Sequence, residues 1–209
     1  MDLSGARLER AVLGGADLTT AKLDGATFEL TVLAATRLAG ASLGGAAFPR
    51  CQLVEADLTA CDLRGADLTG ANFKGATLER ARLDEVRAEN ALFPGARLAG
   101  ASLVGARLRQ AILADADLTG ADASGADLQQ AILQRARCSA ARLAGADLTY
   151  ADLSHANLTG ADLTGAKVFR ARLHLARTAR ALIPGRSLAL GDDAELAEAE
   201  RYRPSLPPR

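Results

Sequence analysis

The hydrophobic residues of this chain return every five positions, in one uninterrupted frame. The central position of each unit, from Leu3 to Ile183, is Leu or Phe in 31 of 37 units, and the position two residues earlier is Ala in 31 of 36. The positions beside the centre are mostly polar, and Gly often closes the unit, as in Ala-Asp-Leu-Thr-Gly at residues 66–70. A period this regular indicates that every unit occupies the same environment.

A period of five matches neither the strand period of two nor the helix period of 3.6. On an α-helix each five-residue step turns the chain by about 500°, so the centres would spread around the circumference and define no buried face. Gly also fills 17 of the positions two after a centre, which is more Gly than a helix tolerates. The pattern therefore predicts short extended segments joined by tight turns, with the centre and the Ala pointing inward. Pro49, Pro94 and Pro184 each directly follow a centre, which is a turn position where a fixed φ helps.

These units resemble the pentapeptide-repeat family, whose consensus is close to Ala-Asp/Asn-Leu followed by two polar or small residues. The resemblance covers roughly residues 1–185. It implies an all-β fold, a right-handed quadrilateral β-helix with four units per coil, and we expect this domain over residues 1–186. At the strand spacing of about 4.8 Å, about nine coils would form a rod about 40–45 Å long.

A C-terminal segment, residues 187–209, follows the repeats. Asp192, with Glu195 three residues later, forms a capping-box pattern, and Pro204 lies where a helix would stop. The pattern predicts a short α-helix over about residues 193–203.

The apolar residues of this segment have two open roles. Leu188, Leu190, Leu196 and Ala199 can cover the open coil at Ile183, or they can meet a second chain. A solenoid end needs such protection, because a bare coil exposes backbone groups and Leu side chains. We expect a homodimer joined through this end, with a folded-back cap as the alternative.

Stacking the sequence in rows of 20 predicts the outer surface. Residues directly before a centre should point outward and form ladders along the rod. One ladder is aliphatic at five of its first seven members: Val12, Val32, Leu92, Ile112 and Ile132. An exposed apolar stripe is a candidate partner surface, although β-branched residues also simply suit a strand face.

Charges form alternating bands along the rod. The tail from Ser187 holds five of the 25 acidic and three of the 25 basic residues, so the repeats hold 20 acids and 22 bases. The central acidic band, which we call the acidic girdle, is a second candidate partner surface and consists of Asp115, Asp117, Asp122 and Asp127. The alternative is an ordinary charge-mixed surface without a specific role.

No catalytic or cofactor site is expected. Leu-sized and Ala-sized side chains would fill the interior and leave no pocket. The two histidines, His155 and His174, fall near Asp152 on one face, and two His with one carboxylate can hold a metal. We interpret them instead as unrelated surface histidines, and we expect no metal.

Composition and termini indicate a cytoplasmic protein. The chain opens with no charged segment followed by an apolar run, so export is not indicated, and no apolar run approaches the roughly 18 residues of a membrane span. The three cysteines fit a reducing compartment. Cys51 and Cys61 take the small inward position and Cys138 takes a centre, so all three are expected to be buried.

Two functions stay open. Some bacterial pentapeptide-repeat proteins protect DNA gyrase, a type II topoisomerase, from quinolones or other poisons, and some are dimeric rods viewed as DNA mimics. The uninterrupted frame and the helix signal are similar to that subgroup, so one interpretation is a gyrase-binding resistance protein. However, a duplex is densely negative, whereas these repeats are nearly balanced, which argues against mimicry by overall charge. The alternative is a scaffold with an unknown protein partner. Direct nucleic-acid binding is disfavoured, because few aromatic residues are available to stack bases.

Overall fold

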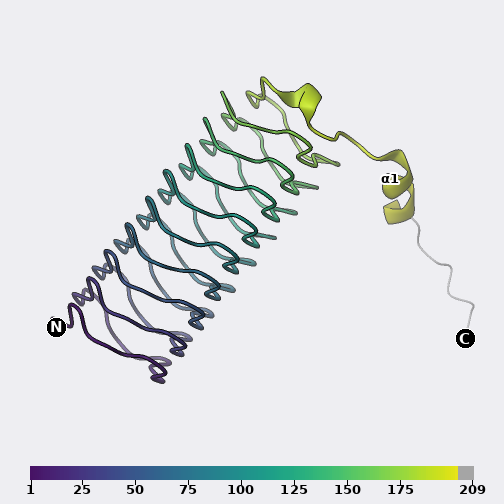
Figure 1. The fold of residues 1–209 in the computed structure, drawn as a ribbon. Helices are drawn as coiled ribbons and strands as arrows, with labels where there is room; N and C mark the ends of the chain where they lie inside the picture. The colour runs from purple at the N-terminus through teal and green to yellow at the C-terminus, as the bar shows by residue number, and fades with distance from the viewer. Residues whose placement is uncertain (202–209) are drawn as a thin grey trace, which may run out of the picture.

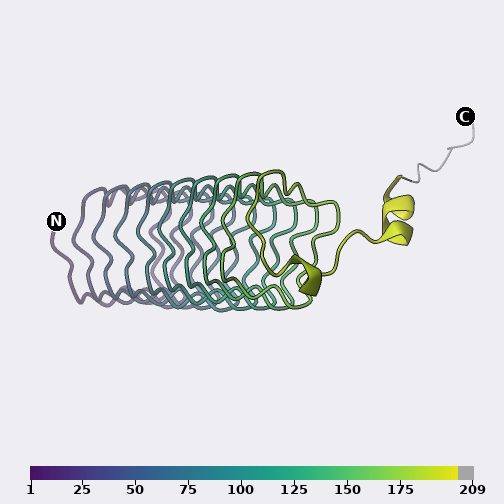
Figure 2. The ribbon, with the colours of Figure 1, turned by 90° about the horizontal axis from the view of Figure 1, so that it is seen from above.

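The chain forms a straight rod of stacked coils with a short helix beyond its C-terminal end (Figures 1 and 2). The computed structural model describes residues 1–201, with side chains described as far as Glu198. The colour gradient of Figure 1 runs steadily along the rod, so each coil packs against the coils that precede and follow it in sequence. Pro204, the expected helix stop, lies outside the described residues.

Each coil contains 20 residues and has four faces. The residue directly before each centre forms a parallel bridge with the residue 20 positions later, from the pair Asp2 and Lys22 to the pair Asp162 and Leu182. Four five-residue units therefore close one turn of a quadrilateral β-helix, and nine full coils span residues 1–180. The predicted register of 20 is confirmed.

The interior is a continuous column of Leu and Ala side chains. Centres such as Leu63 and small residues such as Ala66 are fully buried along almost the whole rod. The four inward phenylalanines form two stacks: Phe28 lies on Phe48 with ring centroids 4.6 Å apart, and Phe73 lies on Phe93 at 4.8 Å. Ring separation thus follows the coil spacing, which leaves no room for a cavity between coils.

A β-turn joins each unit to the next. In the first unit the N–H of Ala6 donates to the carbonyl of Leu3 at 3.0 Å, and Gly5 has a φ of +68°. This positive φ recurs at the last position of every unit through residue 180, in 16 glycines and in 20 residues of other types. The coil therefore imposes the left-handed conformation, and Gly only lowers its cost, which is about 1–2 kcal/mol for other residues. The prolines lie one residue earlier in the turn, as predicted.

Polar residues at the small inward position satisfy their own hydrogen bonds. The hydroxyl of Thr36 donates to the carbonyl of Leu13 at 2.9 Å, and the thiol of Cys61 donates to the carbonyl of Leu38 at 2.7 Å. Both partners lie 23 residues earlier, so the preceding coil supplies the acceptor. Burial raises the pKa of the Cys61 thiol to about 12, which leaves it protonated and unreactive.

The C-terminal segment crosses the end of the last coil before it forms a helix. A 3-10 helix, η1 (Arg186–Leu188), follows the last turn, and Leu190 then pairs in parallel with Arg172. Helix α1 spans Ala194–Arg201 and stands clear of the coils in both views (Figures 1 and 2).

The expected cap of this helix was misplaced by one residue. The capping residue is Asp193, whose carboxylate accepts the N–H of Leu196 at 3.0 Å. Asp192 accepts instead the N–H of Leu175 at 2.8 Å, and so joins the tail to the last coil. Because the side chain of Asp192 is engaged with the backbone of the last coil, Asp193 caps the helix, which begins at Ala194.

Candidate functional site

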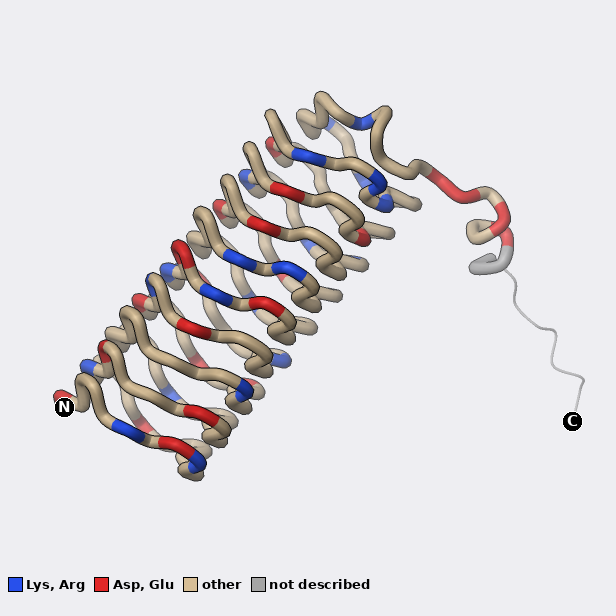
Figure 3. The backbone as a smooth tube through the Cα atoms, in the orientation of Figure 1, with Lys and Arg blue, Asp and Glu red and all other residues tan. Residues whose placement is uncertain are grey.

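The acidic girdle encircles the middle of the rod. Asp117, Asp122 and Asp127 occupy outward bridge positions on three successive faces, and Asp115 sits at a turn with a φ of +59°. Figure 3 shows acidic and basic positions interspersed along the rod, and some neighbouring coils carry like charges on the same face, as Asp127 and Asp147 do.

Each acid of the girdle has a basic partner in an adjacent coil. Asp115 is held by Arg135 through two hydrogen bonds of 2.7 and 2.8 Å. The other three pairs are looser: Asp117 with Arg137 at 3.6 Å, Asp122 with Arg142 at 3.5 Å, and Asp127 with Arg109 at 3.5 Å. The girdle therefore presents ion pairs rather than bare negative charge, which weakens the case for imitation of phosphates.

Hydrogen bonds favour the ionised form of two of these carboxylates, Asp115 and Asp117. The hydrogen bonds and charge of Arg135 lower the pKa of Asp115. Burial alone would raise the pKa of Asp117, but hydrogen bonds from Thr119 and the positive charge of Arg137 bring it below its ordinary value. Asp115 and Asp117 are thus charged at neutral pH, and each lies beside an arginine.

The predicted apolar ladder consists of two separate parts. Val12 pairs with Val32, and Leu92 pairs with Ile112, which pairs in turn with Ile132. Between the two parts, Gln52 and Asn72 join their side-chain amides at 3.0 Å. Val12 is 80% exposed at the end of the rod, whereas the other four are half-buried by their neighbours in the ladder.

The apolar ladder and the acidic girdle meet in one unit. Ile112 and Asp115 both belong to residues 111–115, and Ile132 and Arg135 occupy the same positions one coil later. An aliphatic pair and a bidentate ion pair therefore lie beside each other on two consecutive coils. Three of these four, Ile112, Ile132 and Asp115, are predicted surface residues, and Arg135 joins them through its contact with Asp115.

The tail residues predicted to cover the last coil are largely exposed. Leu188, Leu190 and Leu196 are 57%, 48% and 38% exposed. It is Ala189, which the sequence did not single out, that packs against the core. Ala199 lies in α1, where its side chain is outside the described residues.

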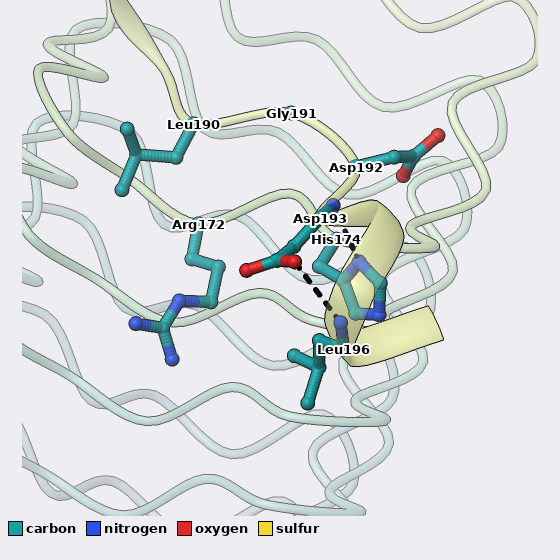
Figure 4. A pocket seen from close by; sticks show the side chains of 7 residues that line it. All are labelled: Arg172, His174, Leu190, Gly191, Asp192, Asp193 and Leu196. Atoms are coloured by element: carbon teal, nitrogen blue, oxygen red, sulfur yellow. Dashed lines mark hydrogen bonds between the residues drawn. The ribbon is translucent and has the colours of Figure 1, made fainter. Parts of the chain in front are cut away.

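A pocket opens between the last coil and the start of α1 (Figure 4). It has a volume of about 330 Å³ and is lined by Arg172, His174, Leu190, Gly191, Asp192, Asp193 and Leu196. His174 is fully buried, because the tail covers it, so the expectation of a surface position for this histidine is wrong. Its Nδ1 accepts the N–H of Asp193 at 3.1 Å, and its ring meets His155 edge to face at 5.5 Å.

Neither metal binding nor a membrane span has support in the part of the chain that the structure describes. Within residues 1–201, no three His, Cys, Asp or Glu side chains are grouped so that they could hold a metal ion. Neither of the two helices there has the length and hydrophobicity to cross a bilayer.

A second pocket and an exposed aromatic pair lie on the last coils, and neither was predicted from the sequence. Tyr150 and Phe169 lie on turns of the last two coils, with ring centroids 5.8 Å apart. Beside Tyr150 is a pocket of about 280 Å³ that shares Arg172 and Leu190 with the first. The sequence does contain a hint of this pair: Tyr150 and Phe169 both occupy turn positions and are 19 residues apart, one fewer than a full coil.

Comparison with protein families identifies the repeats. The model of pentapeptide repeats matches in eight copies, which cover residues 2–31 and 36–174. The chain belongs to the pentapeptide-repeat family, and its coils form the right-handed quadrilateral β-helix of that family. Proteins of this family are generally non-catalytic structural or interaction modules.

Two solved structures give the comparison more detail. HetL from the cyanobacterium Nostoc sp. strain PCC 7120, a pentapeptide-repeat protein involved in the regulation of heterocyst differentiation, is 31% identical. The match covers 91% of this chain and 87% of HetL, with a TM-score of 0.70. QnrB1, a plasmid-mediated fluoroquinolone resistance protein, is 23% identical over 92% of this chain and 96% of its own, with a TM-score of 0.60. No curated protein sequence matches.

Proposed function

We propose that this protein is a non-enzymatic binding rod whose partner is DNA gyrase or another type II topoisomerase, and that it confers resistance to a topoisomerase poison. The observation that carries the binding role is the surface shared by Ile112, Ile132, Asp115 and Arg135. Its two aliphatic side chains supply apolar contact area, and the charged groups of the adjacent ion pair orient the partner through directional polar contacts. The filled core leaves the outer faces as the place where the rod acts.

The choice of topoisomerase rests on the family resemblance and on the shared fold with QnrB1, a fluoroquinolone resistance protein. Because the girdle is compensated by arginines, binding would depend on shape, apolar contact and paired charges rather than on imitation of a duplex. Such an interface should be only moderately sensitive to salt, unlike one that copies a chain of phosphates.

A gyrase assay tests this proposal. DNA supercoiling, and cleavage-complex formation with a fluoroquinolone, are measured with and without micromolar protein. We expect protection from the drug, and we expect the double variant Ile112→Lys with Ile132→Lys to abolish it. Val12→Lys is the matched control, because it changes the same ladder at the far end of the rod. An unchanged cleavage level with the wild-type protein would rule out the topoisomerase role.

A regulatory scaffold with another protein partner is the second candidate. HetL favours it, since HetL is more similar in sequence and structure than QnrB1 and is involved in regulation of differentiation. Photocrosslinking from position 112 in cells would test it. A single protein captured at position 112 but not at position 12 would support a scaffold role, and equal capture at both positions would contradict it.

Assembly and location complete the proposal. We propose a homodimer joined through helix α1 at the C-terminal end, where Leu196 is exposed, in a reducing cytoplasm. Three free, buried cysteines are in keeping with such a compartment.

A further inference from the structure

Exposed aromatic residues occur at one place on the described surface. The chain has five Phe and two Tyr, and four of the Phe are stacked inside the rod. Among residues 1–198, Tyr150 and Phe169 are the two aromatic side chains with large exposure, 50% and 48%, and they contact each other edge to face. Exposed aromatic pairs of this kind are typical of binding hot spots, because they supply much contact area at low entropic cost.

An arginine without an acidic partner lies on this pair. The guanidinium of Arg170 is 5.9 Å from the centre of the Phe169 ring. Ion pairs on this rod mostly join an acid to a base 20 residues later, as Asp152 joins Arg172 at 3.5 Å. The residue 20 positions before Arg170 is Tyr150, so the position that usually holds an acidic partner holds an aromatic residue instead. None of the described carboxylates forms an ion pair with Arg170.

The pocket beside this pair exists because the tail leaves the register of 20. Leu190 pairs with Arg172 after only 18 residues, since η1 shortens the path across the end of the coil. The side chain of Leu190, which is 48% exposed, then forms one wall of the 280 Å³ pocket. The rest of the lining comes from Tyr150, Ala151, Asp152, Arg170 and Arg172.

The last coil, which supplies Arg170 and Arg172 to this pocket, is rich in basic residues, and the tail beyond it carries Asp192 and Asp193. Residues 161–186 contain six bases and one acid, Asp162. Asp152, the acid within the pocket, is already engaged by Gln134 at 2.8 Å, by Ser154 and by Arg172. The pocket therefore offers an uncompensated cation beside an apolar and aromatic surface.

We propose that this C-terminal pocket binds a peptide segment of a partner protein in which an acidic residue adjoins an aromatic residue. The carboxylate of the peptide pairs with Arg170, whose planar guanidinium can donate two parallel hydrogen bonds to it. The aromatic ring of the peptide packs between Tyr150 and Leu190. The volume suits one side chain rather than a larger ligand. This site goes beyond the proposed topoisomerase surface, because it lies in the last coils and not on the unit around Ile112.

A defined peptide tests the site on the full-length protein. The probe is a fluorescein-labelled, terminally blocked hexapeptide that alternates aspartate and phenylalanine, titrated by fluorescence anisotropy. Two controls alternate lysine with phenylalanine and aspartate with serine. We expect saturable binding of the acidic aromatic peptide alone, and weaker binding as the salt concentration rises.

Three variants locate the binding. Arg170→Glu should reduce the affinity about tenfold or more, because it replaces attraction with repulsion. Arg50→Glu is the matched control: Arg50 is exposed, occupies the same turn position six coils earlier and also has positive φ. Tyr150→Gly should weaken binding without loss of folding, because the φ of +61° at this position suits Gly.

Several results would overturn the proposal. They are no binding of the acidic aromatic peptide, equal binding of the lysine peptide, or an affinity that Arg170→Glu leaves unchanged. Sedimentation velocity supplies one more. If Arg170→Glu converts a dimer to a monomer, the acidic helix of a second copy occupies the pocket, and the partner assignment is wrong.

Discussion

The imidazole Nδ1 of His174 accepts the backbone N–H of Asp193 at 3.1 Å, and Asp193 in turn caps helix α1. One fully buried side chain of the last coil thus connects the solenoid to the helix (Figure 4). The attachment of the tail should depend on this acceptor more than on the exposed leucines around it.

Replacing His174 should loosen the tail and leave the rod intact. His174→Phe keeps an aromatic ring but removes the acceptor, and an unsatisfied N–H costs about 1–3 kcal/mol. We expect faster hydrogen exchange of residues 190–197 and unchanged exchange in the central coils. His174→Asn is the control, because its amide oxygen can take the place of Nδ1. Equal exchange in the Phe and Asn variants would show that the hydrogen bond does not hold the tail.

Two truncations separate the cap from the proposed dimer contact. Removal of residues 194–209 deletes α1 but keeps Ala189 on the core and Leu190 paired with Arg172. We expect this shorter protein to remain soluble and to become monomeric in light scattering. Removal of residues 187–209 also uncovers the last coil and should cause aggregation. A dimer that persists after the first truncation would place the dimer contact elsewhere on the rod.

Core substitutions should matter most in the middle of the rod. Leu103 is buried by coils on both sides, so Leu103→Ala should lower the free energy of unfolding by about 2–5 kcal/mol. Leu3 fills the same position in the first coil but is only half-buried, so Leu3→Ala should cost much less. Urea unfolding followed by circular dichroism measures both. Similar costs at the two sites would contradict a core stacked in one dimension.

Substitutions at two neighbouring turns should change the stability of the fold in opposite directions. Ala60 has a φ of +55° and Gly65 a φ of +65°, and a Cβ added to Gly65 would meet no atom within 4 Å. Ala60→Gly should therefore stabilise the fold, and Gly65→Ala should destabilise it, each by about 1 kcal/mol or less, because backbone strain outweighs the entropy of the unfolded chain. Thermal unfolding of both variants checks the sign. Stabilisation by Gly65→Ala would contradict strain at this turn.

Acid should destabilise the rod only below about pH 4. Hydrogen bonds from the side chain and backbone of Thr19 lower the pKa of Asp17, and those of Thr164 do the same for Asp162. A carboxyl whose pKa is lower in the folded state stabilises the fold fully above its unfolded pKa of about 3.9, and that stabilisation is lost as the pH falls through the folded value. The Tm should be level from pH 7 to about 5 and decrease below about 4. A Tm that rises under acid would contradict these lowered values.

The repetitive part of the molecule was predictable, and the tail was not. The five-residue frame predicts the burial of Cys61 by counting, and the four units per coil that the family resemblance implies predict the pairing of Ile112 with Ile132. The frame also places opposite charges in adjacent coils, but the bidentate contact of Asp115 with Arg135 depends on side-chain reach that a ladder does not reveal.

Beyond Gly185 no period constrains the chain. The displaced cap at Asp193, the burial of His174 and the pocket wall at Leu190 all follow from the short path through η1. Such a path is decided by how the tail packs on the coil, and no local pattern in the sequence specifies it. The sequence therefore indicated the surface around Ile112 but not the pocket beside Tyr150.

The register of 20 also makes the rod a spacer of adjustable length. Loss or gain of one whole coil, such as residues 61–80, would return every later residue to its original face, whereas a change that is not a multiple of 20 residues would rotate the faces against each other. Removal of a coil between Ile132 and Arg172 would bring the central surface and the C-terminal pocket closer by about 4.8 Å, the spacing of one strand. Evolution can thus tune the distance between two binding surfaces in fixed steps without redesigning either of them.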